Sequence, residues 1–232
     1  MCIECSNNSD KSEYCKCKCS DEKIVYDRAG GDLFYCDECE HHISTRSPNL
    51  RKYATMNLPE RAIRAKEGSV YYFAYGSNLN TDQMKSRLGE WERTENCELY
   101  GYKLTFDKHS ENWDGGVADI IKTDNENDVV DGAIYLISTE QMKKMDEKEG
   151  GYRKIDSLVT TYETGKARFR FAAKTYEVIK KGDFETPSDR YLQTIVKGLI
   201  QHNITAVHRI ERILRAAQYK EDALSFMKKF GV

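Results

Sequence analysis

An unbroken hydrophobic run near residue 70 constrains the fold more than any other feature of the chain. Positions 70–75 are all β-branched, aromatic or alanine, which is too apolar for a strand with one face in water and predicts a strand buried on both faces. Gly76-Ser77-Asn78 then end the strand with residues that favour tight turns. Asn80 or Thr81 can cap a helix that starts directly afterwards. The backbone N–H groups of such a junction converge on one point, which suits a carboxylate or a developing oxyanion.

The rest of the chain predicts mostly short strands, with helices in two places. The expected strands are rich in Tyr, Val, Ile and Phe and cover 98–106, 116–121, 129–137, 155–161 and 168–173. One helix is expected over 139–149, and two or three more after about Ser188. This pattern predicts an α+β fold built around a small mixed β-barrel-like sheet with flanking helices.

Several segments resemble the gamma-glutamylcyclotransferases, which release 5-oxoproline from γ-glutamyl compounds. Residues 72–79 read Tyr-Phe-Ala-Tyr-Gly-Ser-Asn-Leu, similar to the signature of that family, and we call Gly76 to Asn78 the signature turn. Further similar segments follow in the family's order at 113–120, 130–135, 145–154 and 187–192. The resemblance extends over roughly 69–215 and implies both the barrel-like fold and an enzyme that needs no cofactor.

Glu149 is the predicted catalytic residue. Met142 and Met145 set the apolar stripe of helix 139–149, and Glu149 falls on the same stripe at i+7. Burial and the negative end of the helix dipole both favour the protonated form of a carboxylate, which suits a group that accepts and returns a proton. From the residues alone, a frayed last turn with Glu149 in water is the alternative. The resemblance favours catalysis, because the acid before Gly150 occupies the family's catalytic position.

The implied chemistry is intramolecular. A γ-glutamyl compound carries its own amino nucleophile, and holding the chain folded contributes about 7–11 kcal/mol through proximity. Glu149 is expected to take a proton from the ammonium group and pass it to the departing amine, while backbone N–H groups hold a carboxylate or oxyanion. By the resemblance, the substrate contacts come from the signature and the late helix: Tyr72, Phe73, Ala74, Tyr75, Gly76, Ser77, Asn78 and Tyr191. Elsewhere, Cys97 is expected in the core, and His202 and His208 in solvent.

Seven of the eight cysteines precede residue 40, and their paired spacing is typical of a structural zinc site. The candidate ligands are Cys2, Cys5, Cys15, Cys17, Cys19, Cys36, Cys39 and His41. One scheme joins the first and last Cys-x-x-Cys pairs in a zinc-ribbon-like site and leaves the middle cysteines, with His41 or His42, for a second ion. A crossed pairing, in which the first pair shares an ion with the middle cysteines, is also open, and disulfides or free thiols are the alternative to zinc. We expect one or two structural zinc ions.

Three parts are expected: a zinc-binding module at 1–48, a linker at 49–68 and the cyclotransferase-like domain at 69–232. The module has almost no aliphatic core, so metal binding is expected to drive its folding. It carries six Lys/Arg against ten Asp/Glu, a balance that opposes nucleic-acid binding. A protein partner or a stabilising role is the expectation for it.

Composition favours a cytoplasmic protein. Charged residues make up 32% of the chain, the formal net charge is −2, and the mean hydropathy is −0.73. Neither a membrane helix nor a secretory signal is expected. Two functions remain open. The first is a cyclotransferase acting on a γ-glutamyl amino acid, a γ-glutamylamine or glutathione, the signature wording being closest to the γ-glutamyl amino acid group. The second is a non-enzymatic binding or adaptor protein that holds a γ-glutamyl-like ligand and uses the zinc module for a partner.

Overall fold

The computed structural model describes the backbone of residues 24–26, 33–36 and 42–44, and all atoms of 62–162 and 169–232. The chain divides into two compact units, Met1–Glu60 and Arg61–Val232. In the first unit, β1 (Ile24–Tyr26), β2 (Leu33–Cys36) and β3 (His42–Ser44) form an antiparallel sheet in that order. Among the predicted zinc ligands, Cys36 lies in β2, and the others lie outside the described residues. Zinc binding by residues 1–48 therefore stays a prediction.

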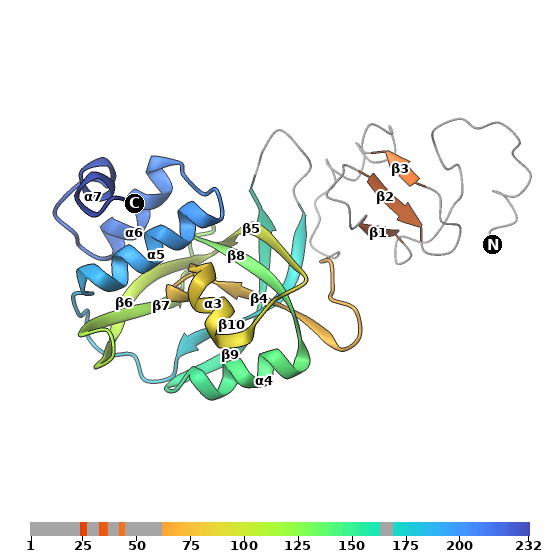
Figure 1. The fold of residues 1–232 in the computed structure, drawn as a ribbon, viewed down its shortest axis with the longest axis horizontal. Helices are drawn as coiled ribbons and strands as arrows, with labels where there is room; N and C mark the ends of the chain where they lie inside the picture. The colour runs from red at the N-terminus through yellow and green to blue at the C-terminus, as the bar shows by residue number, and fades with distance from the viewer. Residues whose placement is uncertain (1–23, 27–32, 37–41, 45–61, 163–168) are drawn as a thin grey trace, which may run out of the picture. The chain divides into compact units, whose positions relative to one another are not determined.

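The second unit is built on a closed five-stranded barrel in the order β10-β4-β8-β5-β9 (Figure 1). Its only parallel pair is β10 with β4, and the other neighbours are antiparallel. A separate hairpin of β6 and β7 lies beside it. The strands are β4 (Ser69–Ala74), β5 (Arg93–Tyr100), β6 (Tyr102–Ser110), β7 (Gly115–Lys122), β8 (Val129–Ser138), β9 (Tyr152–Thr161) and β10 (Arg170–Val178).

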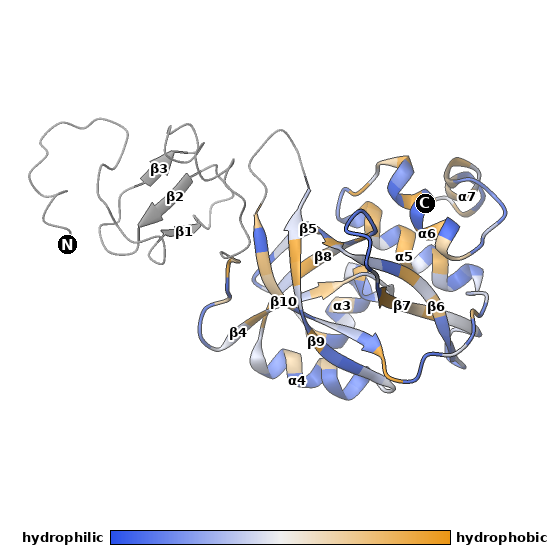
Figure 2. Ribbon diagram, turned by 180° about the vertical axis from the view of Figure 1, so that it is seen from behind, coloured by the Kyte–Doolittle hydropathy of each residue, from blue (hydrophilic) through white to orange (hydrophobic). Residues whose placement is uncertain are grey.

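Strand β4 is buried on both faces, as its composition predicts. Phe73 and the rings of Tyr71 and Tyr75 lie in the larger core, which fills the barrel and continues under the C-terminal helices. Tyr72 and Ala74 alternate with them and lie in a second core outside the barrel. The alternation follows from the two-residue period of a strand. Figure 2 shows the corresponding hydrophobic stretches along β8 and β10.

Five helices pack around the strands. α3 (Thr81–Leu88) and α4 (Thr139–Lys148) close the outer core through Met84, Met142 and Met145. α5 (Asp189–Gln201), α6 (Val207–Ala216) and α7 (Ala223–Phe230) lie together on the side opposite α4 (Figure 1). Side chains cap four of these helices, and α4 begins with a full capping box between Ser138 and Gln141. The α+β barrel with flanking helices confirms the predicted fold class of this unit.

Two boundaries differ from the sequence-based expectation. The prediction of a single strand over 98–106 is wrong, because Gly101 adopts φ +74° and turns the chain between β5 and β6. At the other boundary, Ile63 falls within the predicted linker, yet it pairs with Phe171 of β10 and exchanges backbone hydrogen bonds with its neighbours. The described end of that segment therefore extends the barrel sheet.

The β6–β7 hairpin buries a pair of carboxylates. Asp107 stands at the point where the register of the hairpin shifts, and it faces Asp119 of β7. Asp119 accepts a hydrogen bond from the N–H of Val178 (2.7 Å) and pairs with Lys181. Burial, together with the charge of Asp119, raises the pKa of Asp107 to about 6, and one of its carboxylate oxygens has no hydrogen-bond partner.

Helix α6 is more than an amphipathic surface helix. Arg209 and Arg212 reach from it to Glu98 of β5 and Asp131 of β8, with separations of 2.7 Å for Arg209–Glu98 and 2.9 Å for Arg212–Asp131. The ring of Tyr162 lies 3.6 Å from the Arg209 guanidinium. This cluster ties the C-terminal helices to the barrel. Among the described residues, none of the helices has both the length and the apolar character needed to span a membrane.

Candidate active site

The signature turn links β4 to α3. Leu79 and Asn80 donate N–H bonds to the carbonyls of Gly76 and Ser77, which forms the short 3₁₀ helix η2 (Ser77–Leu79). The Asn80 side chain then accepts from the N–H of Gln83 and starts α3, as predicted. All three residues of η2 are buried. The turn is therefore held by its own hydrogen bonds between two elements of regular structure.

The surroundings of Gly76 leave little space for a side chain. Its φ of −108° is accessible to other residues. A Cβ added there would lie 3.1 Å from the hydroxyl of Tyr191 and 3.2 Å from the Cβ of Ala118. The signature turn, the start of α5 and β7 therefore meet at this glycine.

A second glycine brings α5 against the same turn. A Cβ on Gly198 would lie 2.5 Å from the amide nitrogen of Asn80 and 2.5 Å from the carbonyl carbon of Leu79. Only a residue without a side chain allows this approach. The position of the signature turn is thus fixed partly by the middle of α5.

Glu149 follows α4 as its C-cap residue, and its carboxylate is directed inward at the signature turn. Its Oε1 accepts hydrogen bonds from Asn78 Nδ2 and from Arg87 Nη1, both at 2.9 Å. The side chain is only 14% exposed, so the frayed, solvated alternative does not apply. Within the described part of the chain, Oε2 has no hydrogen-bond partner. One carboxylate oxygen is thus fixed and the other is available.

The side chains of α3 complete the setting of Glu149. Arg87 donates to Asn78 Oδ1 as well as to Glu149, and Gln83 donates to Ser77 Oγ (2.9 Å) and to Asn78 Oδ1 (3.0 Å). Asn78 therefore links the turn, α3 and α4 through one side chain. The cation of Arg87 balances the charge of the partly buried carboxylate.

Two tyrosines of the predicted set border this network. Asn78 Nδ2 also donates to the hydroxyl of Tyr72 (2.7 Å), and burial, with the nearby charge of Glu149, raises the Tyr72 pKa well above its usual value. The Tyr191 hydroxyl accepts from the N–H of Ala118 (3.1 Å), and burial raises its pKa to about 12. Both phenols are neutral at physiological pH and keep their hydrogen-bonding hydrogens.

The other predicted contacts are placed differently. Phe73 is fully buried in the barrel core, and Ala74 lies in the outer core. The hydroxyl of Tyr75 donates to the backbone carbonyl of Tyr176 (2.7 Å). These three residues support the strand that carries the turn. Of the other predicted residues, Asn78 is hydrogen-bonded to Glu149, and the Tyr191 hydroxyl lies against Gly76.

A histidine–tyrosine pair behind the turn was not predicted from the sequence. The prediction that His202 is solvated is wrong: its ring is buried, and Nε2 lies 2.7 Å from the Tyr135 hydroxyl and 3.0 Å from the carbonyl oxygen of Leu79. The Tyr135 hydroxyl lies 3.1 Å from the Asn78 carbonyl oxygen, to which it can donate. Burial lowers the His202 pKa, which keeps the ring neutral. By contrast, His208 is exposed and Cys97 is fully buried, as expected.

Arg87 and Gln83 were also missed, although a signal exists in the sequence. They are spaced i, i+4 and lie directly beside the Met84–Leu88 stripe that buries α3. That position brings their polar ends to the edge of the buried face. In the ranges with described side chains, no group of three or more His, Cys, Asp or Glu is arranged to hold a metal ion.

Comparison with known proteins identifies the family. Residues 129–207, which include Glu149 and Tyr191, match the model of the AIG2-like family. The gamma-glutamylcyclotransferase of Bos taurus is 29% identical over 152 residues, covering 61% of this chain and 77% of the bovine protein. The Homo sapiens gamma-glutamylcyclotransferase is 30% identical over 146 residues, covering 60% of this chain and 74% of the human protein.

Solved structures agree with this assignment. A structure described as a gamma-glutamyl cyclotransferase superposes with a TM-score of 0.55 at 25% identity, over 69% of this chain and 99% of its own. An uncharacterized Homo sapiens protein shares the fold, with a TM-score of 0.56 at 24% identity, over 72% of this chain and 100% of its own. The chain belongs to the gamma-glutamylcyclotransferase family.

Proposed function

We propose that this protein is a cofactor-independent cyclotransferase that converts γ-glutamyl compounds to 5-oxoproline and a free amine. The observation that carries the proposal is the state of Glu149, with Oε1 fixed by Asn78 and Arg87 while Oε2 has no partner among the described residues. A fixed carboxylate with one available oxygen suits a general base. The family relationship supports the same conclusion.

In the proposed mechanism, Oε2 accepts a proton from the substrate's α-ammonium group. The resulting amine attacks the γ-carbonyl carbon of the same molecule, and the carbonyl oxygen becomes an oxyanion. Backbone N–H groups around Gly76 and Ser77 stabilise that charge or hold the glutamyl carboxylate. Glu149 then returns the proton to the departing nitrogen as the oxyanion collapses and the carbon–nitrogen bond breaks, and the extra proton on the lactam nitrogen passes to solvent. The products are the five-membered lactam and the free amine.

Tyr191 and Asn78 have supporting roles in this proposal. The Tyr191 hydroxyl lies against Gly76, where a ligand bound at the turn would meet it. Asn78 holds the carboxylate towards the turn and keeps Tyr72 beside it. Because ring closure is intramolecular, positioning these groups accounts for most of the expected rate enhancement.

The test is 5-oxoproline release by the full-length protein from a γ-glutamyl amino acid, a γ-glutamylamine and glutathione. Glu149→Gln keeps the side-chain shape but removes the base, so kcat should fall by about 10² to 10⁴. The variant should still bind the best substrate in calorimetry. The matched control is Glu147→Gln, an exposed acid on the same helix, which should leave kcat unchanged.

Two results contradict the proposal. Near-normal turnover in Glu149→Gln would remove this residue from the mechanism. Binding of γ-glutamyl compounds by the wild-type protein without any 5-oxoproline release would favour the non-enzymatic binding function instead.

A further inference from the structure

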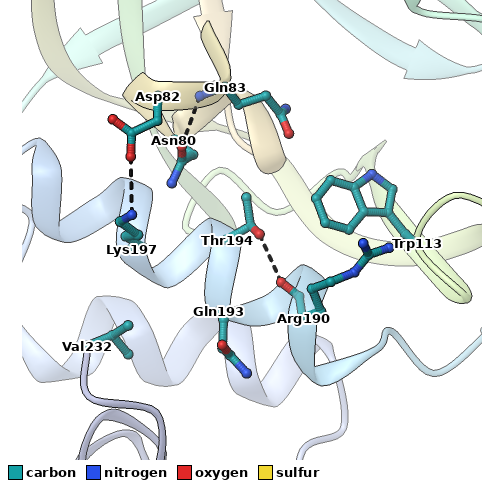
Figure 3. Close-up of a pocket in the computed structure, with 9 residues that line it drawn as sticks. All are labelled: Asn80, Asp82, Gln83, Trp113, Arg190, Gln193, Thr194, Lys197 and Val232. Carbon is teal, nitrogen blue, oxygen red and sulfur yellow. Dashed lines mark hydrogen bonds and ion pairs between the residues drawn. The ribbon is translucent and has the colours of Figure 1, made fainter. Parts of the chain in front are cut away.

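A pocket of about 370 Å³ lies beside the signature turn and has no part in the mechanism above. Its walls come from the start of α3, the tip of the β6–β7 hairpin, the part of α5 between Arg190 and Lys197, and Val232. Figure 3 shows Gln83, Trp113 and Arg190, one from each of these elements, around the same hollow.

Two residues belong to both the pocket and the surroundings of the signature turn. Gln83 lines the pocket, and its amide group binds Ser77 Oγ and Asn78 Oδ1. The Trp113 ring lies 4.9 Å from the ring of Tyr191, whose hydroxyl lies against Gly76. The pocket is therefore separated from the turn by single side chains. The pocket thus adjoins the turn through Gln83 and through the contact of Trp113 with Tyr191.

Arg190 places a positive charge at the wall of the pocket. Its guanidinium lies 4.9 Å from the centre of the Trp113 ring and donates to the backbone carbonyl of Asn112. The other cation of the pocket, Lys197, is paired with Asp82 at 3.1 Å. Arg190 makes no ion pair with any residue that the structure describes. It is thus an exposed cation, held against the Trp113 ring, with no carboxylate partner in the described part of the chain.

We propose that this pocket is the subsite for the leaving group and that Arg190 binds a carboxylate on it. A guanidinium offers paired N–H donors that match a carboxylate, and the indole holds it in place. The preferred substrates are then γ-glutamyl amino acids or peptides whose departing part carries a free carboxylate, over γ-glutamylamines that lack one. This inference rests on the proposed cyclotransferase function and makes Arg190 a specificity-determining residue.

The test uses two substrates that differ only in the carboxylate: γ-glutamylglycine and γ-glutamylmethylamine. For the wild-type protein, kcat/KM should be about tenfold higher for γ-glutamylglycine. Arg190→Gln should raise KM for γ-glutamylglycine by about tenfold without lowering kcat, and should leave γ-glutamylmethylamine unaffected. Arg190→Lys keeps the charge without the paired donors, so its KM for γ-glutamylglycine should lie between those of the wild type and Arg190→Gln.

Arg215→Gln is the matched control, because it removes an exposed arginine from α6 that does not line the pocket. It should change neither substrate's kinetics. Calorimetry in the Glu149→Gln background provides a readout without turnover, in which the added Arg190→Gln change should weaken γ-glutamylglycine binding by about tenfold.

The outcomes separate the two proposals. If the wild type releases 5-oxoproline from both compounds and Arg190→Gln leaves the ratio of their kcat/KM values unchanged, only the subsite is refuted. If neither compound releases 5-oxoproline and neither binds, the cyclotransferase function fails and the subsite fails with it.

Discussion

Replacing Gly198 with alanine tests whether the contact between α5 and the signature turn positions the active site. In an unconstrained helix, the change would stabilise the protein by about 1 kcal/mol through helix propensity. Here the new Cβ would lie 2.5 Å from two backbone atoms, in Asn80 and Leu79, and 2.7 Å from the Leu79 Cβ. Ordinary contacts begin at 3.4 Å, so α5 and the turn must separate by roughly 0.9 Å.

Overpacking of this kind costs about 1–3 kcal/mol, and backbone atoms leave little room for relief. After the propensity gain of about 1 kcal/mol, we expect a net loss of up to about 2 kcal/mol in the free energy of unfolding, measured in urea. A displacement of the turn by about 1 Å should also lower kcat/KM by roughly 10². Both effects follow from one added methyl group.

The stability control is Gly150→Ala, where the added Cβ meets no atom within 4 Å. The free energy of unfolding of Gly150→Ala should not fall. An alanine variant at position 198 that is as stable as the wild type and fully active would refute the reasoning, because it would mean that α5 can withdraw without moving the turn.

Two further changes probe other parts of the structure. In Gly76→Val, the added Cβ would lie 3.1 Å from the Tyr191 hydroxyl, and the two methyl groups would extend beyond it. Calorimetry should therefore show at least a tenfold loss in affinity for γ-glutamyl ligands. Unchanged binding to a folded variant would mean that the ligand binds elsewhere. Asp107→Asn should stabilise the protein at pH 7.5 by about 1–2 kcal/mol. The pKa of Asp107 is raised to about 6 in the folded state, above the unfolded value of 3.8. Protonated Asp107 therefore stabilises the folded state fully below pH 3.8, and this stabilisation is lost as the pH rises through 6. The advantage of Asn should therefore shrink between pH 7.5 and pH 5, and an equal advantage at both pH values in urea unfolding would contradict the assignment.

The features that the sequence predicted well are those set by local periodicity. The run ending at Tyr75 is buried on both faces because the barrel core and the outer core each take alternate side chains. The inward position of Glu149 follows from the three-residue and seven-residue spacings after Met142. Neither required knowledge of the tertiary structure.

Long-range contacts set the features that it missed. His202 lies on a stretch of polar character, and its burial depends on Tyr135, which is 67 residues away. Arg190 gains its role only because the hairpin tip brings Trp113 across it. The turn at Gly101 was not predicted for a different reason: the residues on both sides of it have strong strand propensity.

The pairing of the barrel strands has a consequence for motion. β4, β8 and β5 are joined over six and eight residue pairs, and β9 and β10 over nine. The two contacts that close the barrel, β10–β4 and β5–β9, have only two pairs each. The barrel therefore consists of a three-stranded part and a two-stranded part, joined by two short strand pairings. Glu149 stands in the crossover from one part to the other, since α4 follows β8 and β9 begins at Tyr152. Opening of these short pairings would move the Glu149 carboxylate relative to β9. Asn78 and Arg87 would meanwhile hold the carboxylate to the part of the barrel that carries the signature turn.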